Sequence, residues 1–394
     1  MGHFGLRLRL GVAAAAVLAI TAAAFAVVGA GTAGVSAEAA DGKVVATRNY
    51  FATKGPWLVW DKGSCSFKTT TNHPSTYSGM LRKVTGEDLS IVYTAAETTA
   101  AADKTINGSF EKYAKLAGIN LKIFNNQFPS KSKPIQNAQA AAAVKPAVVV
   151  SSIWIPELYP QVAKTYQRAC TPYIDMFDIN TTKNVPGFQA GFVASGIALA
   201  DGVIQVVKKR GWPANETWMV VCGAPLIAKT PGTDLDVLTT FRSRVTKALQ
   251  LSKDKISPIL DCKADPNDAR TVTTDWLTAH PQAKYVIAVM WNDQMAYGMS
   301  QALEDKGYTS ATAVAAGGQA NQPVLEIMAK GNSILQANFD KDFPTWGIIG
   351  LSMAQDIAAG RPVPYYIDPG VVPVVGTDAA KKLLAARKKS AAGG

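Results

Sequence analysis

The side chains best suited to bind a ligand form the tripeptide Trp291-Asn292-Asp293. Its indole can stack on an apolar or ring-shaped surface. Its amide and carboxylate can exchange hydrogen bonds with hydroxyl groups. The chemistry that these residue types predict is binding by stacking and hydrogen bonding.

The tripeptide lies between a predicted strand and a predicted helix. Residues 285–290 form an apolar run, as in a strand buried on both faces. Apolar residues at helical spacing follow over 294–306, and Gly307 stands where a helix commonly ends. Because ligands of open parallel α/β sheets collect at the carboxyl ends of strands, we expect a ligand site here. The plainer alternative is that Asn292 or Asp293 only caps the helix.

Catalysis is not favoured by the sequence. It contains no G-x-S-x-G, H-E-x-x-H or P-loop motif, and the S-x-x-K match at 130–133 lies in a polar stretch without partner motifs. The glycine-rich match at 29–34 to the dinucleotide-binding pattern has no strand–helix context. Beyond residue 40 the only histidines are His73 and His280. We therefore expect neither enzymatic activity nor a cofactor.

The N-terminus has the layout of a secretory signal peptide, to which we assign residues 1–39. Arg7 and Arg9 precede the uncharged apolar stretch 10–28, and small residues that suit cleavage follow. A retained membrane anchor is the alternative, because the apolar stretch is long for a signal. The first cysteine is Cys65, so lipid attachment through a cysteine is not indicated. The sequence predicts an exported protein, periplasmic or at the cell surface.

Four cysteines in an exported chain favour disulfides, and they allow three pairings. Cys222 ends one apolar run and Cys262 follows another. If these runs are neighbouring parallel strands, the two sulfurs lie at the same sheet edge, which leaves Cys65 with Cys170. The spacing does not fit a zinc site.

The chain is basic, with a net charge of +11. Removing residues 1–39, which hold two arginines and one glutamate, leaves +10. Part of this charge lies in the tail 381–394, which we expect to be frayed. The other basic residues are scattered rather than interleaved with aromatic ones, so no nucleic-acid partner is expected.

The central part of the chain alternates between predicted strands and helices, as in a parallel sheet with right-handed crossovers. Strands are predicted at 89–93, 121–124, 148–151, 173–177, 218–222, 256–260, 285–290, 312–316, 334–337 and 371–375. Helices are predicted at 100–116, 136–144, 157–169, 189–210, 235–249, 268–279, 294–306, 323–330 and 345–359. Residues 40–85 lack this rhythm and are predicted to form an irregular N-terminal extension.

From about residue 88 to 375 the chain resembles the type I periplasmic binding proteins of the ribose/galactose kind, the substrate-capturing components of ABC importers. The resemblance rests on Asn-Asp-x-Met-Ala-x-Gly-x-x-x-Ala-Leu at 292–303, Val-Ala-Ala-Gly-Gly-Gln at 314–319, Pro172 with Asp178, and Ala-Ala-Gly-Arg-Pro-Val-Pro at 358–364. It implies an α/β fold of two doubly wound parallel-sheet lobes joined by a three-crossover hinge.

By this resemblance the N-terminal lobe comprises 86–184 and 340–368, and the C-terminal lobe comprises 185–339 and 369–380. The crossovers are expected near 184–188, 338–341 and 366–370. The ligand would lie between the lobes, and the lobes would close on it by a hinge motion.

The resemblance, together with the strand-end positions, also predicts a set of ligand-binding side chains. Asn292 and Asp178 match family contacts, whereas Gln319 replaces an aspartate and Phe339 falls near a glutamine position. The full set is Glu97, Ser152, Trp154, Asp178, Trp291, Asn292, Asp293, Gln319 and Phe339. Because few charged contacts are kept, we expect a small, polar, neutral ligand that need not be a common hexose.

The resulting expectation is a monomer that captures a sugar-like small molecule for an ABC permease in the membrane. Two other functions stay open. One is a ligand-sensing receptor for a membrane kinase or chemoreceptor, which neighbouring genes would reveal. The other is a wall-associated binding protein whose attachment depends on residues 381–394.

Overall fold

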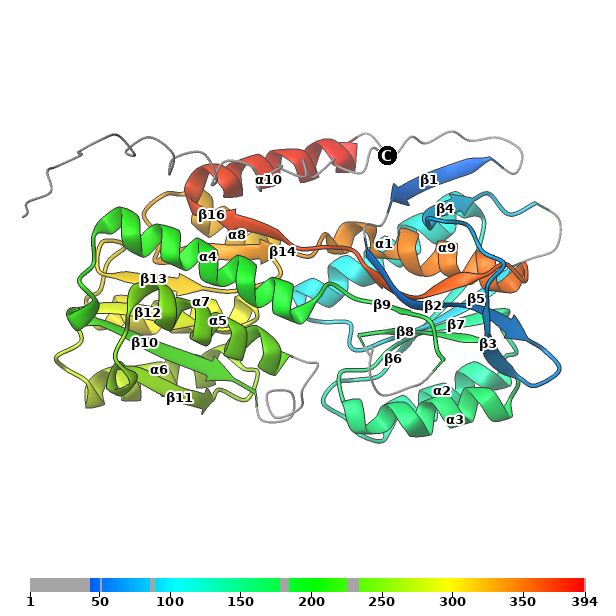
Figure 1. Cartoon of the computed structure of the whole chain (residues 1–394), viewed down its shortest axis with the longest axis horizontal. Coiled ribbons are helices and arrows are strands. Elements are labelled where there is room, and N and C mark those ends of the chain that lie inside the picture. The colour runs from blue at the N-terminus through cyan, green and yellow to red at the C-terminus, as the bar shows by residue number, and fades with distance from the viewer. Residues whose placement is uncertain (1–42, 50–51, 86–88, 178–183, 225–233, 393–394) are drawn as a thin grey trace, which may run out of the picture.

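The computed structural model describes residues 43–49, 52–85, 89–177, 184–224 and 234–392. It contains two α/β lobes side by side, each built around its own sheet (Figure 1). The sheets are mixed but mostly parallel, and they confirm the predicted fold class of two doubly wound lobes.

The sheet of the first lobe has eight strands in the order β3-β2-β15-β9-β8-β7-β5-β6. Its parallel part consists of β5 (Ser90–Ala95), β6 (Asn120–Asn125), β7 (Val148–Ser152), β8 (Tyr173–Met176), β9 (Gly187–Phe188) and β15 (Val363–Asp368). Helices α1 (Ala101–Ala117) and α9 (Trp346–Ala358) pack together on one face of this sheet, and α2 (Lys133–Ala143) and α3 (Tyr159–Arg168) on the other.

Strand β7 shows why the strands of this lobe are apolar throughout. Val148 and Val150 belong to the core under α1 and α9, whereas Val149 belongs to the core under α2 and α3. Successive side chains of a strand point to opposite faces, and here both faces are covered by helices. A continuous apolar run is therefore the expected pattern.

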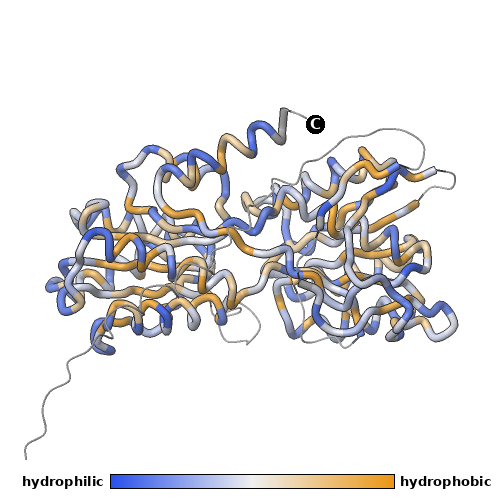
Figure 2. Tube along the Cα trace, turned by 45° about the horizontal axis from the view of Figure 1, so that its top comes forward, coloured by the Kyte–Doolittle hydropathy of each residue, from blue (hydrophilic) through white to orange (hydrophobic). Residues whose placement is uncertain are grey.

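The sheet of the second lobe has six strands in the order β11-β10-β12-β13-β14-β16. The parallel strands are β10 (Thr217–Gly223), β11 (Ile256–Asp261), β12 (Tyr285–Val289), β13 (Ala313–Ala316) and β14 (Leu335–Asp340), and β16 (Val372–Val375) pairs antiparallel with β14. The helices are α4 (Phe192–Arg210), α5 (Asp234–Leu249), α6 (Pro266–Ala279), α7 (Asp293–Asp305), α8 (Gln322–Ala329) and α10 (Gly376–Ala392). Figure 2 shows apolar strands in the interior of both lobes.

The chain passes between the two sheets three times: from β9 to α4, from β14 to α9, and from β15 to β16. These passages lie close to the three predicted crossovers. These passages support the predicted division into lobes, which stays a proposal. It assigns 86–184 and 340–368 to the N-terminal lobe, and 185–339 and 369–380 to the C-terminal lobe.

The prediction of an irregular extension at 40–85 is wrong. This segment contains β1 (Val44–Asn49), β2 (Ala52–Asp61), β3 (Ser66–Thr70) and β4 (Ser78–Arg82). Strand β2 pairs antiparallel with β15 and with β3, so it extends the first sheet at its edge. Among the residues of β2 whose burial is described, Trp57 and Leu58 are buried and residues 53–56 are exposed. The apolar run at 57–60 is short and stands among polar residues, so it did not reveal a strand of this length.

The prediction of a frayed tail at 381–394 is also wrong, because α10 continues to Ala392 and packs against α8. Leu383 and Leu384 contact the apolar core of the second lobe. The many lysines of this segment concealed the short apolar stripe that holds the helix in place.

The two disulfides are Cys222–Cys262 and Cys65–Cys170. The first joins the ends of β10 and β11. These are neighbouring parallel strands, which was the condition for pairing Cys222 with Cys262. The second ties the turn between β2 and β3 to the segment that follows α3. The predicted signal peptide lies outside the described residues, and within them no helix is both long and apolar enough to cross a membrane.

Candidate ligand-binding site

Two adjoining cavities lie between the lobes, and they share Trp154, Trp291 and Gln319. Trp154 follows β7 of the first lobe, whereas Trp291 and Gln319 follow β12 and β13 of the second. The carboxyl ends of parallel strands from both sheets therefore meet at one cleft, which is where open α/β sheets hold their ligands.

The first cavity, here named the aromatic chamber, has an empty volume of about 520 Å³. Six aromatic rings dominate its lining, which consists of Ile153, Trp154, Pro156, Tyr159, Phe177, Phe192, Trp291, Gln319, Lys341 and Phe343. The only charged group in the lining is Lys341, whose Nζ lies 5.1 Å from the ring centroid of Phe192 and 5.4 Å from that of Phe339. Ammonium groups are attracted to ring faces at such distances.

The second cavity, here named the polar chamber, has an empty volume of about 800 Å³. Carboxylates, amides and small residues predominate in its lining, which consists of Glu97, Thr99, Ala100, Ala102, Asp103, Phe128, Trp154, Ala264, Trp291, Asn292, Gln294, Gln319 and Asn321. Together the chambers present an apolar end and a hydrogen-bonding end, joined at the three shared residues.

Asp103 is a buried carboxyl group in the polar chamber, and its side chain is only 1% exposed. Neither of its oxygens has a hydrogen-bond partner among the described residues. Burial raises its pKa well above the usual range, and the charge of Glu97 adds to this shift. Unpaired buried polar groups are costly and are frequent at functional sites.

Glu97 has a second role besides lining the polar chamber. Its carboxylate accepts hydrogen bonds from the backbone N–H of Thr99 at 2.9 Å, from the Thr99 hydroxyl at 2.6 Å and from the backbone N–H of Ala100. Burial acts to raise the pKa of Glu97, but these hydrogen bonds outweigh it and the pKa is lowered. An ionised Glu97 therefore fixes the segment that leads into α1.

The structure gives the residues of the predicted tripeptide different roles. Trp291 lines both chambers, and its Nε1, like that of Trp154, is buried without an acceptor in the described part of the chain. Asn292 lines the polar chamber and also caps α7, because its Oδ1 accepts a hydrogen bond from the Met295 N–H at 2.9 Å. The cap and the ligand contact are thus compatible at Asn292.

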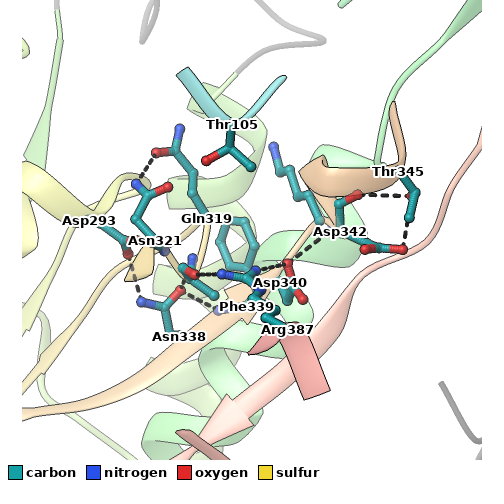
Figure 3. A network of polar contacts seen from close by, with 12 residues as sticks. Thr105, Asp293, Gln319, Asn321, Asn338, Phe339, Asp340, Asp342, Thr345 and Arg387 are labelled. Carbon is teal, nitrogen blue, oxygen red and sulfur yellow. Dashed lines mark hydrogen bonds and ion pairs between the residues drawn. The ribbon is translucent and has the colours of Figure 1, made fainter. Parts of the chain in front are cut away.

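Asp293, predicted as a ligand contact, lines neither chamber and is 1% exposed. Its Oδ1 accepts a hydrogen bond from Asn338 Nδ2 at 2.6 Å, and its Oδ2 accepts one from the backbone N–H of Asn321 (Figure 3). Burial raises its pKa to about 7. The side chain is therefore a brace that connects the start of α7 to the segments after β13 and in β14.

Gln319 occupies a strained position between the chambers, with a φ of 94°. Its backbone N–H donates to the Phe339 carbonyl at 3.0 Å, and its Oε1 lies 3.4 Å from Asn321 Nδ2 (Figure 3). The preceding Gly318 has no room for a side chain, since a Cβ would lie 2.1 Å from the Phe339 ring. Phe177, in the aromatic chamber, has a φ of 87°. Such strained residues persist only with strong support and cluster at binding sites.

Two further predicted contacts lie behind the lining. Ser152 is fully buried at the end of β7, and Phe339 is 1% exposed and packs under Gly318. Neither residue lines a chamber, because each points into the core of its lobe. Asp178 lies outside the described residues. The predicted residues that line the cleft are Glu97, Trp154, Trp291, Asn292 and Gln319.

The sequence reasoning missed several lining residues. Phe177 and Lys341 directly follow β8 and β14, so the strand-end rule that found Trp291 could have found them. Asp103 lies in the first turn of the helix that follows β5, so it is further from the strand end than the strand-end rule reaches. Phe192 and Phe343 enter the cleft from the passages between lobes, for which the sequence has no local pattern.

The fold and its cleft define a two-lobed, ligand-binding protein. The chain belongs to the periplasmic binding protein domain family, whose model matches residues 91–362. This family consists of extracytoplasmic binding proteins rather than enzymes. A search among curated proteins finds no match.

Solved structures of similar fold include a Mycobacterium smegmatis protein in complex with β-D-fucofuranose, with a TM-score of 0.65 and 20% identity over 77% of this chain and 97% of that one. An Actinobacillus succinogenes ABC transporter solute-binding protein with bound D-allose has a TM-score of 0.63 and 18% identity over 74% and 99%. One from Bacillus halodurans with bound myo-inositol has a TM-score of 0.62 and 16% identity over 77% and 100%.

Proposed function

We propose that this protein captures a small polar, sugar-like ligand between its lobes and delivers it to the permease of an ABC importer. The observation that carries the proposal is a single cleft lined from both lobes, with Trp154 on one side and Trp291 and Gln319 on the other. A ligand that contacts both lobes favours the arrangement in which they are close, and this is how such proteins signal occupancy.

The chemistry of the polar chamber supports a polyol. Carboxylates and amides exchange hydrogen bonds with several hydroxyls at once, and an aromatic ring covers the apolar face of a sugar. The similar structures with β-D-fucofuranose, D-allose and myo-inositol hold ligands of this class. We assign Asp103, Glu97 and Asn292 to the hydroxyls, and Trp154 and Trp291 to the ring.

The proposed setting is outside the cytoplasm, in the periplasm or at the cell surface, with the protein acting as a monomer. The two disulfides suit an oxidising compartment. Deleting the gene should abolish uptake of the ligand if the protein serves import. It should leave uptake intact but abolish a transcriptional or chemotactic response if the protein serves sensing.

A thermal-melt screen of the purified protein against sugars, polyols, nucleosides, amino acids and aromatic acids tests the binding function. A ligand at 100 times its Kd should add about 2.7 kcal/mol to the free energy of unfolding, seen as a rise in Tm of several degrees. Gln319→Ala should remove most of this rise. Gln322→Ala, on the exposed start of α8, is the matched control and should retain it.

Cooperative melting without a shift for any sugar or polyol would contradict a sugar-like ligand. A shift that Gln319→Ala leaves unchanged would place the ligand outside the cleft.

A further inference from the structure

We propose that the ligand is a sugar bearing an apolar substituent, with its hydroxyls in the polar chamber and the substituent in the aromatic chamber. This inference rests on the proposed function, and it adds the apolar substituent to the sugar-like ligand proposed there.

The two chambers differ in what they can bind. Six of the ten lining residues of the aromatic chamber are aromatic, so a hydroxyl placed against these rings would lose its partners in water and gain few in return. The polar chamber holds Asp103, Glu97, Asn292 and Asn321 beside three rings, so it offers hydroxyl groups the carboxyl and amide partners that the lining of the aromatic chamber mostly lacks. A ligand that satisfies both chambers must have two unlike ends.

The arrangement of the chambers also favours an extended ligand. They adjoin at Trp154, Trp291 and Gln319, which line both. A free monosaccharide in the polar chamber would leave the rings of the aromatic chamber without a partner.

Three residues that line the chambers have buried polar atoms without a hydrogen-bond partner among the described residues, and a ligand with several oxygens could supply partners for them. Both Asp103 carboxyl oxygens lack a donor, and the indole N–H groups of Trp154 and Trp291 lack an acceptor among the described residues. A hydroxyl-bearing ring supplies donors to Asp103, and the linking oxygen of a glycoside lies between the two ends, beside the tryptophans. Each new hydrogen bond removes the cost of a buried unpaired group.

The distribution of charge argues against two other two-ended ligands. A cationic apolar group would be repelled by Lys341 in the aromatic chamber. An acid group in the polar chamber would be repelled by Glu97, whose hydrogen bonds lower its pKa and keep it ionised. A neutral polyol joined to a neutral apolar group would be repelled in neither chamber.

Isothermal calorimetry with matched glycosides tests the inference. We would compare the methyl and phenyl β-glycosides of D-glucose, D-galactose and D-ribose, which share the linking oxygen and differ in the substituent. For the sugar that binds, the phenyl glycoside should bind at least about tenfold tighter, because its ring leaves water for an apolar chamber. Phe192→Leu should reduce this preference severalfold, because it removes one ring from the aromatic chamber.

Asp103→Asn should weaken the methyl and phenyl glycosides alike, since it acts on the shared polyol. Equal affinity of the two glycosides for every sugar would overturn the inference and leave the proposed function intact. The same holds if the phenyl preference is unchanged by both Phe192→Leu and Phe343→Leu. If none of the six glycosides binds, the pair of methyl and phenyl derivatives is made from the sugar or polyol that the thermal-melt screen identifies. Failure of every sugar and polyol in that screen to bind a cooperatively folded protein would overturn the inference and the proposed function together.

Discussion

Asp293 is the residue at which the site and the stability of the fold are most closely connected. Its carboxyl group joins α7 to Asn338 and to the Asn321 backbone, and burial raises its pKa from 3.8 to about 7. Between these values the folded protein binds the proton more readily than the unfolded chain does. The free energy of unfolding therefore falls as the pH rises from about 4 to about 7, and then levels off.

We expect this carboxyl group to make the protein roughly 2–3 kcal/mol more stable at pH 5 than at pH 8, as measured by urea unfolding. Asp293→Asn should make that slope shallower, because an amide does not titrate, whereas Asp103 and Asp340, whose pKa values burial also raises, keep their contributions. Asp275→Asn, on the exposed side of α6, is the control and should keep it. An Asp293→Asn protein with the original slope would show that another group causes the dependence.

Single residues of the site could be predicted only in part. Trp291, Asn292 and Gln319 were found because they follow apolar runs, and residues at strand ends face the cleft. Asp293, one position further, turns inward and becomes a brace. An apolar run shows about where a strand ends, but the direction of each following side chain depends on the turn that the backbone takes there.

Helix α10 is an element whose contribution reaches the binding site. Arg387 donates from Nη1 to the Ala320 carbonyl at 2.6 Å and from Nη2 to Asp340 Oδ1 at 2.8 Å (Figure 3). Ala320, like Gln319, has a positive φ. The helix therefore holds the strained segment that presents Gln319 to both chambers, although Arg387 itself lines neither.

Arg387→Ala should weaken ligand binding about tenfold or more by calorimetry and destabilise the fold, because it leaves Asp340 buried without its cation. Breaking a buried ion pair on one side costs about 3–5 kcal/mol. Burial raises the pKa of Asp340 to about 6, partly offset by Arg387, so the loss of stability should be larger at pH 8 than at pH 5. Lys388→Ala, exposed on the same helix, should change neither property.

If Arg387→Ala lowers stability and leaves affinity intact, α10 supports the lobe without positioning Gln319.

At the scale of whole elements, the sequence best predicted the strands that have helices on both faces of their sheet. The parallel strands of the second lobe and β5, β6, β7 and β8 of the first were predicted, since strands covered on both faces tend to be continuous apolar runs. The parallel strands β9 and β15 were not predicted. Strand β2, at an edge of the first sheet, and helix α10, on the outside of the second lobe, were missed. Their burial is confined to a few side chains, so their sequences resemble those of exposed segments.

At the scale of the whole molecule, the passages between the lobes are connected to the N-terminal strands. Arg48 in β1 forms an ion pair with Asp342, in the passage after β14, and its Nη2 donates to the Pro369 carbonyl, in the passage after β15, at 3.0 Å. Asp342 in turn donates its backbone N–H to Asp340. Two of the three passages are thus held by one side chain.

The last prediction concerns the motion between the lobes. Because the cleft is lined from both lobes, a ligand that contacts both sides binds the closed arrangement more tightly and can shift the population only by that difference in affinity. Adding a saturating amount of the tightest-binding glycoside should therefore reduce the radius of gyration measured by small-angle X-ray scattering. At the same concentration Gln319→Ala should show a smaller reduction, whereas Gln322→Ala should match the unaltered protein. A ligand that calorimetry shows to be bound, but that leaves the radius of gyration unchanged, would mean that one lobe holds it alone and that the second contributes no closure.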